Sequence, residues 1–138
     1  MILKEKRIFI VEDNMQNRLI FQMSLIRHGA SVDFERWGRD TIYHLQNLSR
    51  VDLIVLDLML AEGVTGFDIF DQIRALPKYA SVPIIAVSAM DPSIAIPRLR
   101  KQGFSGFIAK PIDNAQFPKQ LASIISGEAV WSVGERTA

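Results

Sequence analysis

Four short apolar runs constrain the fold of this 138-residue chain more than any other feature of its sequence. They lack polar alternation and read IFIV (8–11), LIVL (53–56), PIIAV (83–87) and GFIA (106–109). Runs of this length are typical of strands buried on both faces, as in a parallel sheet. A further segment, SVDFE (31–35), alternates apolar and polar residues, which predicts a fifth strand at an edge of that sheet.

Segments with apolar residues at helical spacing separate these five predicted strands. The predicted helices span residues 14–27, 40–48, 67–76, 97–102 and 115–125. Because Pro97 would remove a hydrogen bond from a helix that began at Pro92, we expect the fourth helix to be short or broken, with Pro97 near its first turn. Strands and helices in this alternating order predict a parallel sheet with helices on both faces.

Length, charge and cysteine content limit the classes of function. The formal net charge of +1 gives no strong field for nucleic acid or a membrane surface, and the chain has no cysteine for disulfides or thiolate sites. The N-terminus does not resemble a signal peptide, and no apolar stretch reaches the ~18 residues of a membrane span. We therefore expect a cytoplasmic protein with one domain at residues 1–127 and a short tail at 128–138, without a nucleic-acid or membrane partner.

Functional groups follow or end four of the predicted strands. Glu12 and Asp13 follow the first run, Asp57 follows LIVL, Ser88 follows PIIAV, and Lys110 follows GFIA. The carboxyl ends of parallel strands lie on one edge of a sheet, where ligands bind in open α/β folds. The sequence therefore predicts that these five side chains converge.

Such a cluster has an excess of negative charge. Two carboxylates ~5 Å apart repel by roughly 3 kcal/mol at an effective dielectric of ~20. With oxygen ligands only, the metals that suit the site are Mg²⁺, or Mn²⁺ and Ca²⁺ as alternatives. Lys110 then provides a point charge for a phosphoryl group, and the hydroxyl of Ser88 provides a donor. This chemistry indicates phosphoryl transfer to a carboxylate, with Asp57 as the nucleophile.

Four motifs in this order resemble the receiver domain of two-component response regulators. They are VEDN (11–14), LIVLDLML (53–60), VSA (87–89) and AKP (109–111), and the resemblance covers about residues 7–127. It implies a flavodoxin-like α/β fold, with five (βα) units and a doubly wound sheet of five parallel strands in the order 2-1-3-4-5. It also implies a signalling protein and not an enzyme, beyond catalysis of its own aspartyl phosphorylation and dephosphorylation.

The same resemblance implies the partners. A histidine kinase or a histidine phosphotransfer protein would phosphorylate Asp57. The phosphorylated protein would then act on a downstream protein effector, take part in a phosphorelay, or form a homodimer through the fourth and fifth helices and the fifth strand.

Individual residue roles are likewise implied by the resemblance. Glu12, Asp13, Asp57 and the backbone carbonyl of Met59 would hold Mg²⁺, with Mn²⁺ as an alternative. Lys110 would pair with the phosphoryl group.

Three further residues complete this set of implied roles. The bond between Lys110 and Pro111 would be cis. Ser88 would move toward the phosphoryl oxygen, and Phe107 would rotate inward behind it as a two-state switch.

Some positions depart from the family pattern or leave alternatives open. Met59 and Met90 lie where relatives place the groups that flank the attacking water, so we expect slow intrinsic dephosphorylation. Rival readings are a receiver fold that is never phosphorylated and a haloacid-dehalogenase-like phosphohydrolase, although Met59 stands where the latter needs a second Asp. Trp37 and Trp131 are expected to be packing residues, with Trp131 alternatively covering a partner-binding surface.

Overall fold

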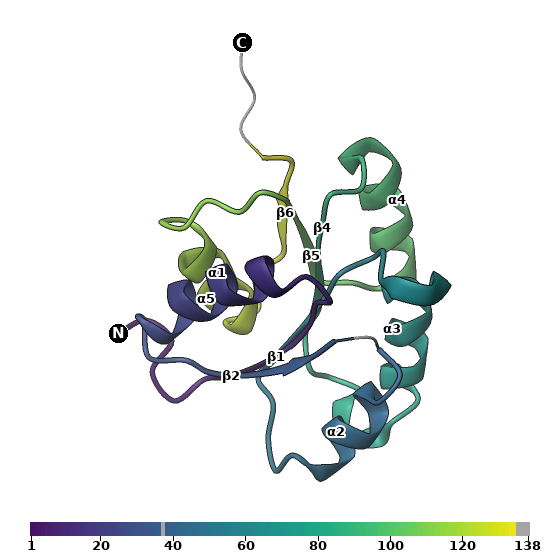
Figure 1. The fold of residues 1–138 in the computed structure, drawn as a ribbon, viewed down its shortest axis with the longest axis horizontal. Coiled ribbons are helices and arrows are strands. Elements are labelled where there is room, and N and C mark those ends of the chain that lie inside the picture. The colour runs from purple at the N-terminus through teal and green to yellow at the C-terminus, as the bar shows by residue number, and fades with distance from the viewer. Residues whose placement is uncertain (37, 135–138) are drawn as a thin grey trace.

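The computed structural model describes residues 1–36 and 38–134, so Trp37 and the last four residues of the predicted tail lie outside it. One parallel sheet runs through this part of the chain in the order β2-β1-β3-β4-β5-β6 (Figure 1). Its strands are β1 (Arg7–Val11), β2 (Ser31–Glu35), β3 (Leu53–Leu56), β4 (Ile84–Ser88), β5 (Gly106–Ala109) and β6 (Val130–Ser132).

The first five strands confirm the predicted parallel sheet and its order. The sixth strand, β6, was not predicted, because three residues in a polar tail do not form a recognisable apolar run. The sheet therefore has six strands, and β6 pairs with the edge of β5 that a five-stranded sheet would leave open.

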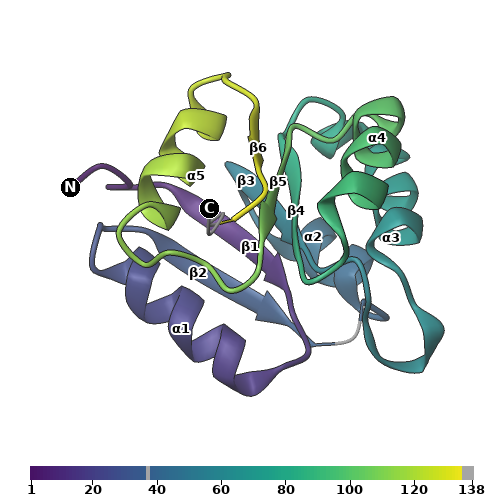
Figure 2. The ribbon, with the colours of Figure 1, turned by 90° about the horizontal axis from the view of Figure 1, so that it is seen from above.

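Helices cover both faces of the sheet, as predicted (Figures 1 and 2). Those on one face are α1 (Met15–Ile26) and α5 (Phe117–Ile125), and those on the other are α2 (Thr41–Asn47), α3 (Gly66–Arg74) and α4 (Pro92–Gln102). Two 3₁₀ turns complete the described elements, η1 (Ala61–Gly63) and η2 (Pro77–Tyr79). No helix among the described residues has both the length and the apolar character needed to cross a membrane.

Alternate residues of the central strands feed two separate hydrophobic layers. In β1, Phe9 packs with the cluster under α2, α3 and α4, whereas Ile8 and Ile10 pack with the cluster under α1 and α5. Successive side chains of a strand point to opposite faces, and here both faces are covered. Because both faces of the sheet are covered, the strands appear in the sequence as continuous apolar runs. The same packing holds the strands in place, and with them the polar residues at the strand ends.

The fourth helix differs from its prediction. Helix α4 is continuous from Pro92 to Gln102, with Pro97 inside it, so the expected short or broken helix is wrong. The carboxylate of Asp91 caps the first turn by accepting a hydrogen bond of 2.9 Å from the amide of Ser93. Pro97 is the sixth helical residue and removes only one internal hydrogen bond, while the buried face at Ala95 and Leu99 holds the helix on the sheet.

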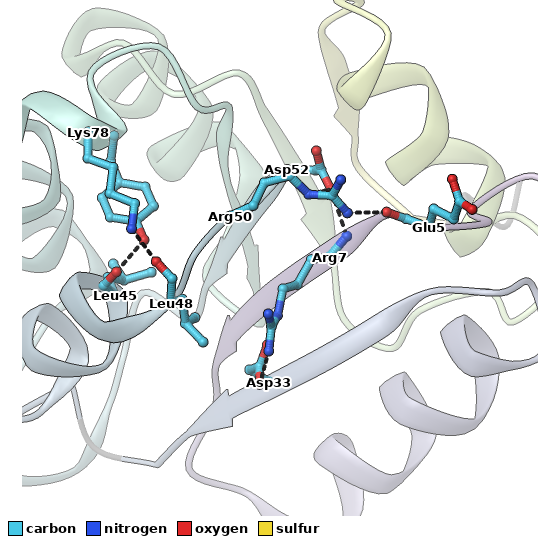
Figure 3. Close-up of polar contacts among 9 residues, drawn as sticks. Glu5, Arg7, Asp33, Leu45, Leu48, Arg50, Asp52 and Lys78 are labelled. Carbon is cyan, nitrogen blue, oxygen red and sulfur yellow. Dashed lines mark hydrogen bonds and ion pairs between the residues drawn. The ribbon is translucent and has the colours of Figure 1, made fainter.

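Charged side chains connect the amino ends of three strands (Figure 3). The guanidinium of Arg7 on β1 donates to Asp33 on β2 over 2.8 Å, and the amide of Arg7 donates to the carboxylate of Asp52, just before β3, over 2.8 Å. Arg50 lies 3.5 Å from Asp52 and also donates to the carbonyl of Glu5. Cations and carboxylates are balanced in this cluster, which fits a structural role.

Candidate functional site

The carboxyl ends of four neighbouring strands bring the predicted polar residues to one edge of the sheet. Glu12 and Asp13 follow β1, Asp57 follows β3, Ser88 is the last residue of β4, and Lys110 follows β5. The parallel registers place these strand ends side by side. Sequence positions as far apart as 12 and 110 therefore meet because of the sheet topology alone.

The ammonium group of Lys110 is the centre of this cluster. Its Nζ atom lies 2.8 Å from Oδ2 of Asp57 and 2.5 Å from Oε1 of Glu12. Glu12 is 1% exposed and Asp57 is 8% exposed, so both carboxylates are largely withdrawn from water. A buried ion pair of this kind is stable only when its remaining polar atoms are also satisfied.

Backbone amides satisfy the remaining carboxylate oxygens. The amide of Met59 donates to Oδ1 of Asp57 over 3.2 Å, and the amide of Asn14 donates to Oε2 of Glu12 over 3.3 Å. Among the described residues, no buried side-chain nitrogen or oxygen lacks a hydrogen-bond partner. The site is therefore held in place by the chain itself.

Burial and ion pairing shift the pKa values of both Glu12 and Lys110 upward. Burial raises the pKa of Glu12, and the hydrogen bond and charge of Lys110 only partly oppose that effect. Burial alone would lower the pKa of Lys110, but the hydrogen bonds and charges of Asp57 and Glu12 outweigh it, so the pKa of Lys110 lies above its usual value. Lys110 therefore stays charged at neutral pH, and Glu12 holds a proton more readily than an exposed glutamate.

A third carboxylate, that of Asp13, gives the cluster the composition of a metal site. Glu12, Asp13 and Asp57 each offer a ligand oxygen, and these oxygens lie within 4.8 Å of one another. Lys110 is the only cation paired with these three carboxylates in the contacts recorded for the described residues. Oxygen ligands with excess negative charge suit a hard divalent cation such as Mg²⁺.

Three other predicted residues surround this cluster without joining the ion pairs described above. Ser88 is fully buried, and its Oγ accepts a hydrogen bond of 3.2 Å from the amide of Met90. Phe107 is fully buried in the layer under α3 and α4. Met59, two residues after Asp57, is 57% exposed. The peptide bond between Lys110 and Pro111 is cis.

Sequence reasoning missed one residue that shapes the site, Gly66 at the start of α3. A Cβ atom at this position would lie 2.4 Å from the carbonyl oxygen of Asp57, so any side chain would push the strand end and the helix apart. The amide of Gly66 also donates to the carbonyl of Leu58 over 3.1 Å. A glycine at the first position of an amphipathic helix was the available signal, but the close approach is visible only in three dimensions.

A parallel sheet with helices on both faces and an acidic cluster at its carboxyl edge is typical of α/β domains that bind a ligand at that edge. The family model described as Response regulator receiver domain matches residues 8–122. The chain therefore belongs to the response regulator receiver domain family, whose members are signalling modules of two-component systems. This confirms the resemblance that the four motifs indicated.

Known proteins of similar length support the same assignment. The polar-differentiation response regulator DivK of Brucella anthropi is 29% identical over 120 residues, which cover 87% of this chain and 96% of that protein. The two-component response regulator ORR12 of Oryza sativa subsp. japonica is 25% identical over 114 residues, which cover 83% of this chain and 93% of that protein. A segment of the probable histidine kinase 6 of the same plant is also similar, with 25% identity over 14% of that protein.

Solved structures share the fold. The non-phosphorylated HemR receiver domain from Leptospira biflexa superposes with a TM-score of 0.77 at 25% identity, covering 97% of this chain and 99% of that one. The chemotaxis response regulator CheY4 of Vibrio cholerae gives a TM-score of 0.78 at 22% identity, covering 86% and 98%.

Proposed function

We propose that this protein accepts a phosphoryl group on Asp57 from a phosphohistidine of a histidine kinase or a histidine phosphotransfer protein. The observation that carries the proposal is the position of Asp57, whose carboxylate contacts the Lys110 ammonium at 2.8 Å and shares an acidic cluster with Glu12 and Asp13. A purely structural ion pair needs one carboxylate for one lysine. Three carboxylates around one lysine support a site that receives further positive charge.

Glu12, Asp13 and Asp57, with the backbone carbonyl of Met59 as a further ligand, would hold Mg²⁺ in the proposed site, and Mn²⁺ would be accepted as well. Bound there, the metal would neutralise the carboxylates and the incoming phosphoryl oxygens. The fit rests on the donor set, which consists of hard oxygen atoms close together in a largely buried position.

In the proposed reaction, an oxygen of Asp57 attacks the phosphorus atom. The bond between phosphorus and that oxygen forms while the bond between phosphorus and the donor nitrogen breaks, and the imidazole leaves with the electron pair and takes up a proton. Lys110, already held at the carboxylate, stabilises the charge that develops on the phosphoryl oxygens. The reaction modifies Asp57 of the protein itself. The protein would therefore be the acceptor of the phosphoryl group and not a classical enzyme.

The proposed output is a change in protein contacts. The hydroxyl of Ser88 is held by the amide of Met90 and would turn toward the phosphoryl group, while Phe107 on the neighbouring strand would respond through packing. The partner would be a downstream protein or a second copy docked on the face of α4, β5 and α5. We place this exchange in the cytoplasm, and we assign the receiver to residues 1–127 and the tail to 128–138.

The experiment that tests the proposal is an intact-mass measurement after incubation with acetyl phosphate and Mg²⁺. We expect the wild type to gain the mass of one phosphoryl group and the Asp57→Asn variant to gain none. Chelation of the metal should prevent the gain. A wild type that gains no mass with any donor would indicate an unphosphorylated binding module, whereas continuous hydrolysis of varied phosphoesters would indicate a hydrolase.

A further inference from the structure

The C-terminal strand β6 covers the β5 edge of the sheet (Figure 2). Its residues pair in parallel with β5, so that Val130 lies opposite Gly106 and Trp131 lies opposite Phe107. β6 has three residues, each partly exposed, whereas the strands at the centre of the sheet are buried throughout. A strand this short, at an edge and partly exposed, contributes few contacts, which favours local opening there over opening at the centre of the sheet.

Gly106 makes this pairing sterically acceptable. A Cβ atom at Gly106 would lie 2.4 Å from the carbonyl oxygen of Val130, a distance at which the strand would have to move away. The next atom outside β6 that such a Cβ would meet is Cγ2 of Ile85 at 3.4 Å, which is close to ordinary contact. The missing side chain therefore opens the β5 edge to another strand, and alanine there would close it.

Trp131 supplies the side-chain contact that holds β6. It packs against the apolar layer that contains Phe107, and the guanidinium of Arg100 on α4 lies 4.5 Å from the centre of its ring system. A cation at this distance over an indole face attracts it electrostatically. The β5 edge thus combines backbone pairing with an aromatic contact between Arg100 and the apolar layer of Phe107.

β6 fills this face incompletely. Two clefts bounded by described residues flank the tail beyond it, and both are lined in part by Val133. One, of about 630 Å³, lies against the loop at Lys110 and against Gln116 before α5. The other, of about 490 Å³, lies against Ile96 and Pro97 of α4. Both clefts border residues that follow Trp131 in the chain, so a segment with larger side chains after its aromatic residue would occupy space that β6 leaves empty.

We infer that the β5 edge is a binding site for an extended segment of a partner protein, and that β6 is a built-in competitor for it. The partner segment pairs in parallel with β5 and places an aromatic side chain between Arg100 and the Phe107 layer, as Trp131 does. This is strand addition, in which backbone hydrogen bonds give affinity and a side-chain pocket gives specificity. The inference does not depend on whether Asp57 is phosphorylated.

The first test measures whether β6 can be displaced. In the full-length chain, hydrogen–deuterium exchange should show weak protection of residues 128–134 in the wild type. In Gly106→Ala, protection of that segment should disappear while the β1 and β3 amides stay protected. Unchanged protection of residues 128–134 in Gly106→Ala would overturn the steric argument. If Gly106→Ala instead loses protection throughout the sheet, β6 unfolds together with the core and does not separate on its own. This result would also contradict the inference.

The second test uses the chain's own strand as a probe. A blocked synthetic peptide EAVWSVG (128–134) is titrated into ¹⁵N-labelled full-length protein and followed by chemical-shift changes. In Trp131→Ala, whose own strand is weakened, the peptide should bind at least about tenfold more tightly than in the wild type, because an attached competitor acts at high effective concentration. The shifts should be confined to β5, the C-terminal half of α4 and the tail.

Two controls decide between the remaining outcomes. The double variant Gly106→Ala/Trp131→Ala should not bind the peptide, and a peptide with alanine in place of the tryptophan should not bind Trp131→Ala. Trp131→Phe, which keeps an aromatic ring, should behave like the wild type. Binding that survives Gly106→Ala would overturn the inference. Sedimentation that shows Trp131→Ala to dimerise without binding the peptide would assign the edge to a second copy and would overturn it as well.

Discussion

The two ends of the parallel sheet both carry clusters of charged side chains, but the clusters differ in balance and burial. At the amino ends, Arg7 and Arg50 face Asp33 and Asp52, and the side chains of Arg7 and Asp33 are each 33% exposed. At the carboxyl ends, three carboxylates meet one lysine, and Glu12 and Asp57 are almost fully buried. Positive and negative charges balance in the first cluster, whereas the second has an excess of negative charge.

The balance of charge separates a cluster that needs no ligand from one that can take up further positive charge. Exposed, balanced ion pairs contribute little to stability and need no ligand. A buried excess of negative charge costs free energy unless protons or cations compensate it. The raised pKa of Glu12, caused by burial, is the sign of that cost at the carboxyl end. The first three variants below alter the carboxyl end and use the amino end, or an exposed position, as the control, and the fourth alters a buried residue near the amino end.

The largest effect should follow from removing the lysine that pairs with Glu12 and Asp57 at the carboxyl end. Lys110→Met leaves Glu12 and Asp57 without their partner, and it removes the donor for the phosphoryl oxygens. We expect the rate of phosphorylation by acetyl phosphate to fall by about a hundredfold, the usual effect of losing one such donor. Lys119→Met on the exposed side of α5 should leave the rate unchanged. Equal rates for both variants would contradict the role of Lys110, provided that circular dichroism shows both to be folded.

The next effect concerns the metal. Asp13→Asn removes one of three clustered carboxylates and should weaken Mg²⁺ binding by at least about tenfold, measured by calorimetry or by competition with Mn²⁺. Asp33→Asn, at the amino end, removes a carboxylate from a balanced ion pair and should leave the affinity unchanged. Equal Mg²⁺ affinities of the two variants would contradict the proposal that the metal binds at the carboxyl end of the sheet and not at the amino end.

A smaller effect is expected on the lifetime of the phosphoryl group. Met59 is exposed beside Asp57 but offers no group that orients water. Met59→Asn supplies such a group and should shorten the lifetime severalfold in a chase followed by intact mass. The control is Met15→Asn at an equally exposed methionine on α1. A wild-type half-life of seconds that Met59→Asn does not change would contradict slow intrinsic dephosphorylation.

The smallest effect is expected on the free energy of unfolding and concerns a buried tyrosine near the amino ends of the strands. Burial raises the pKa of Tyr79, whose hydroxyl donates to the carbonyl of Leu45. A pKa that is higher in the folded state gives stability that is present below the unfolded-state value of about 10 and is lost as pH rises toward the folded-state value. Tyr79→Phe should cost about 1 kcal/mol near neutral pH, and this difference from the wild type should shrink above pH ~10 in urea unfolding. A difference that grows with pH would contradict the assignment.

Topology explains why much of the site could be predicted from sequence. Apolar runs define the strands, and parallel strands must end on one edge, so Asp57 and Lys110 were expected to meet although 53 residues separate them. The structure brings them together with Glu12 and Asp13. The roles of these residues in phosphoryl transfer remain predictions, as do those of Ser88 and Phe107.

Features that depend on contacts across the fold were not predictable in the same way. Helix α4 tolerates Pro97 because packing at Ala95 and Leu99 outweighs one lost hydrogen bond, and neither contact is visible in the local sequence. β6 has no strand signal of its own and forms because Gly106 admits it and Arg100 holds Trp131. The expectation that Trp131 is a packing residue is confirmed, although its partners could not be named from the sequence.

The residue that carries the phosphoryl group decides whether the carboxyl end of the sheet is the acceptor site. After reaction with acetyl phosphate and Mg²⁺, the acyl phosphate is reduced with borohydride, and the modified residue is located by tandem mass spectrometry. We expect a single modified residue, Asp57, and no modification at Glu12, Asp13, Asp33 or Asp52. Modification of any other carboxylate, with Asp57 unchanged, would show that the buried acidic end of the sheet is not the acceptor site.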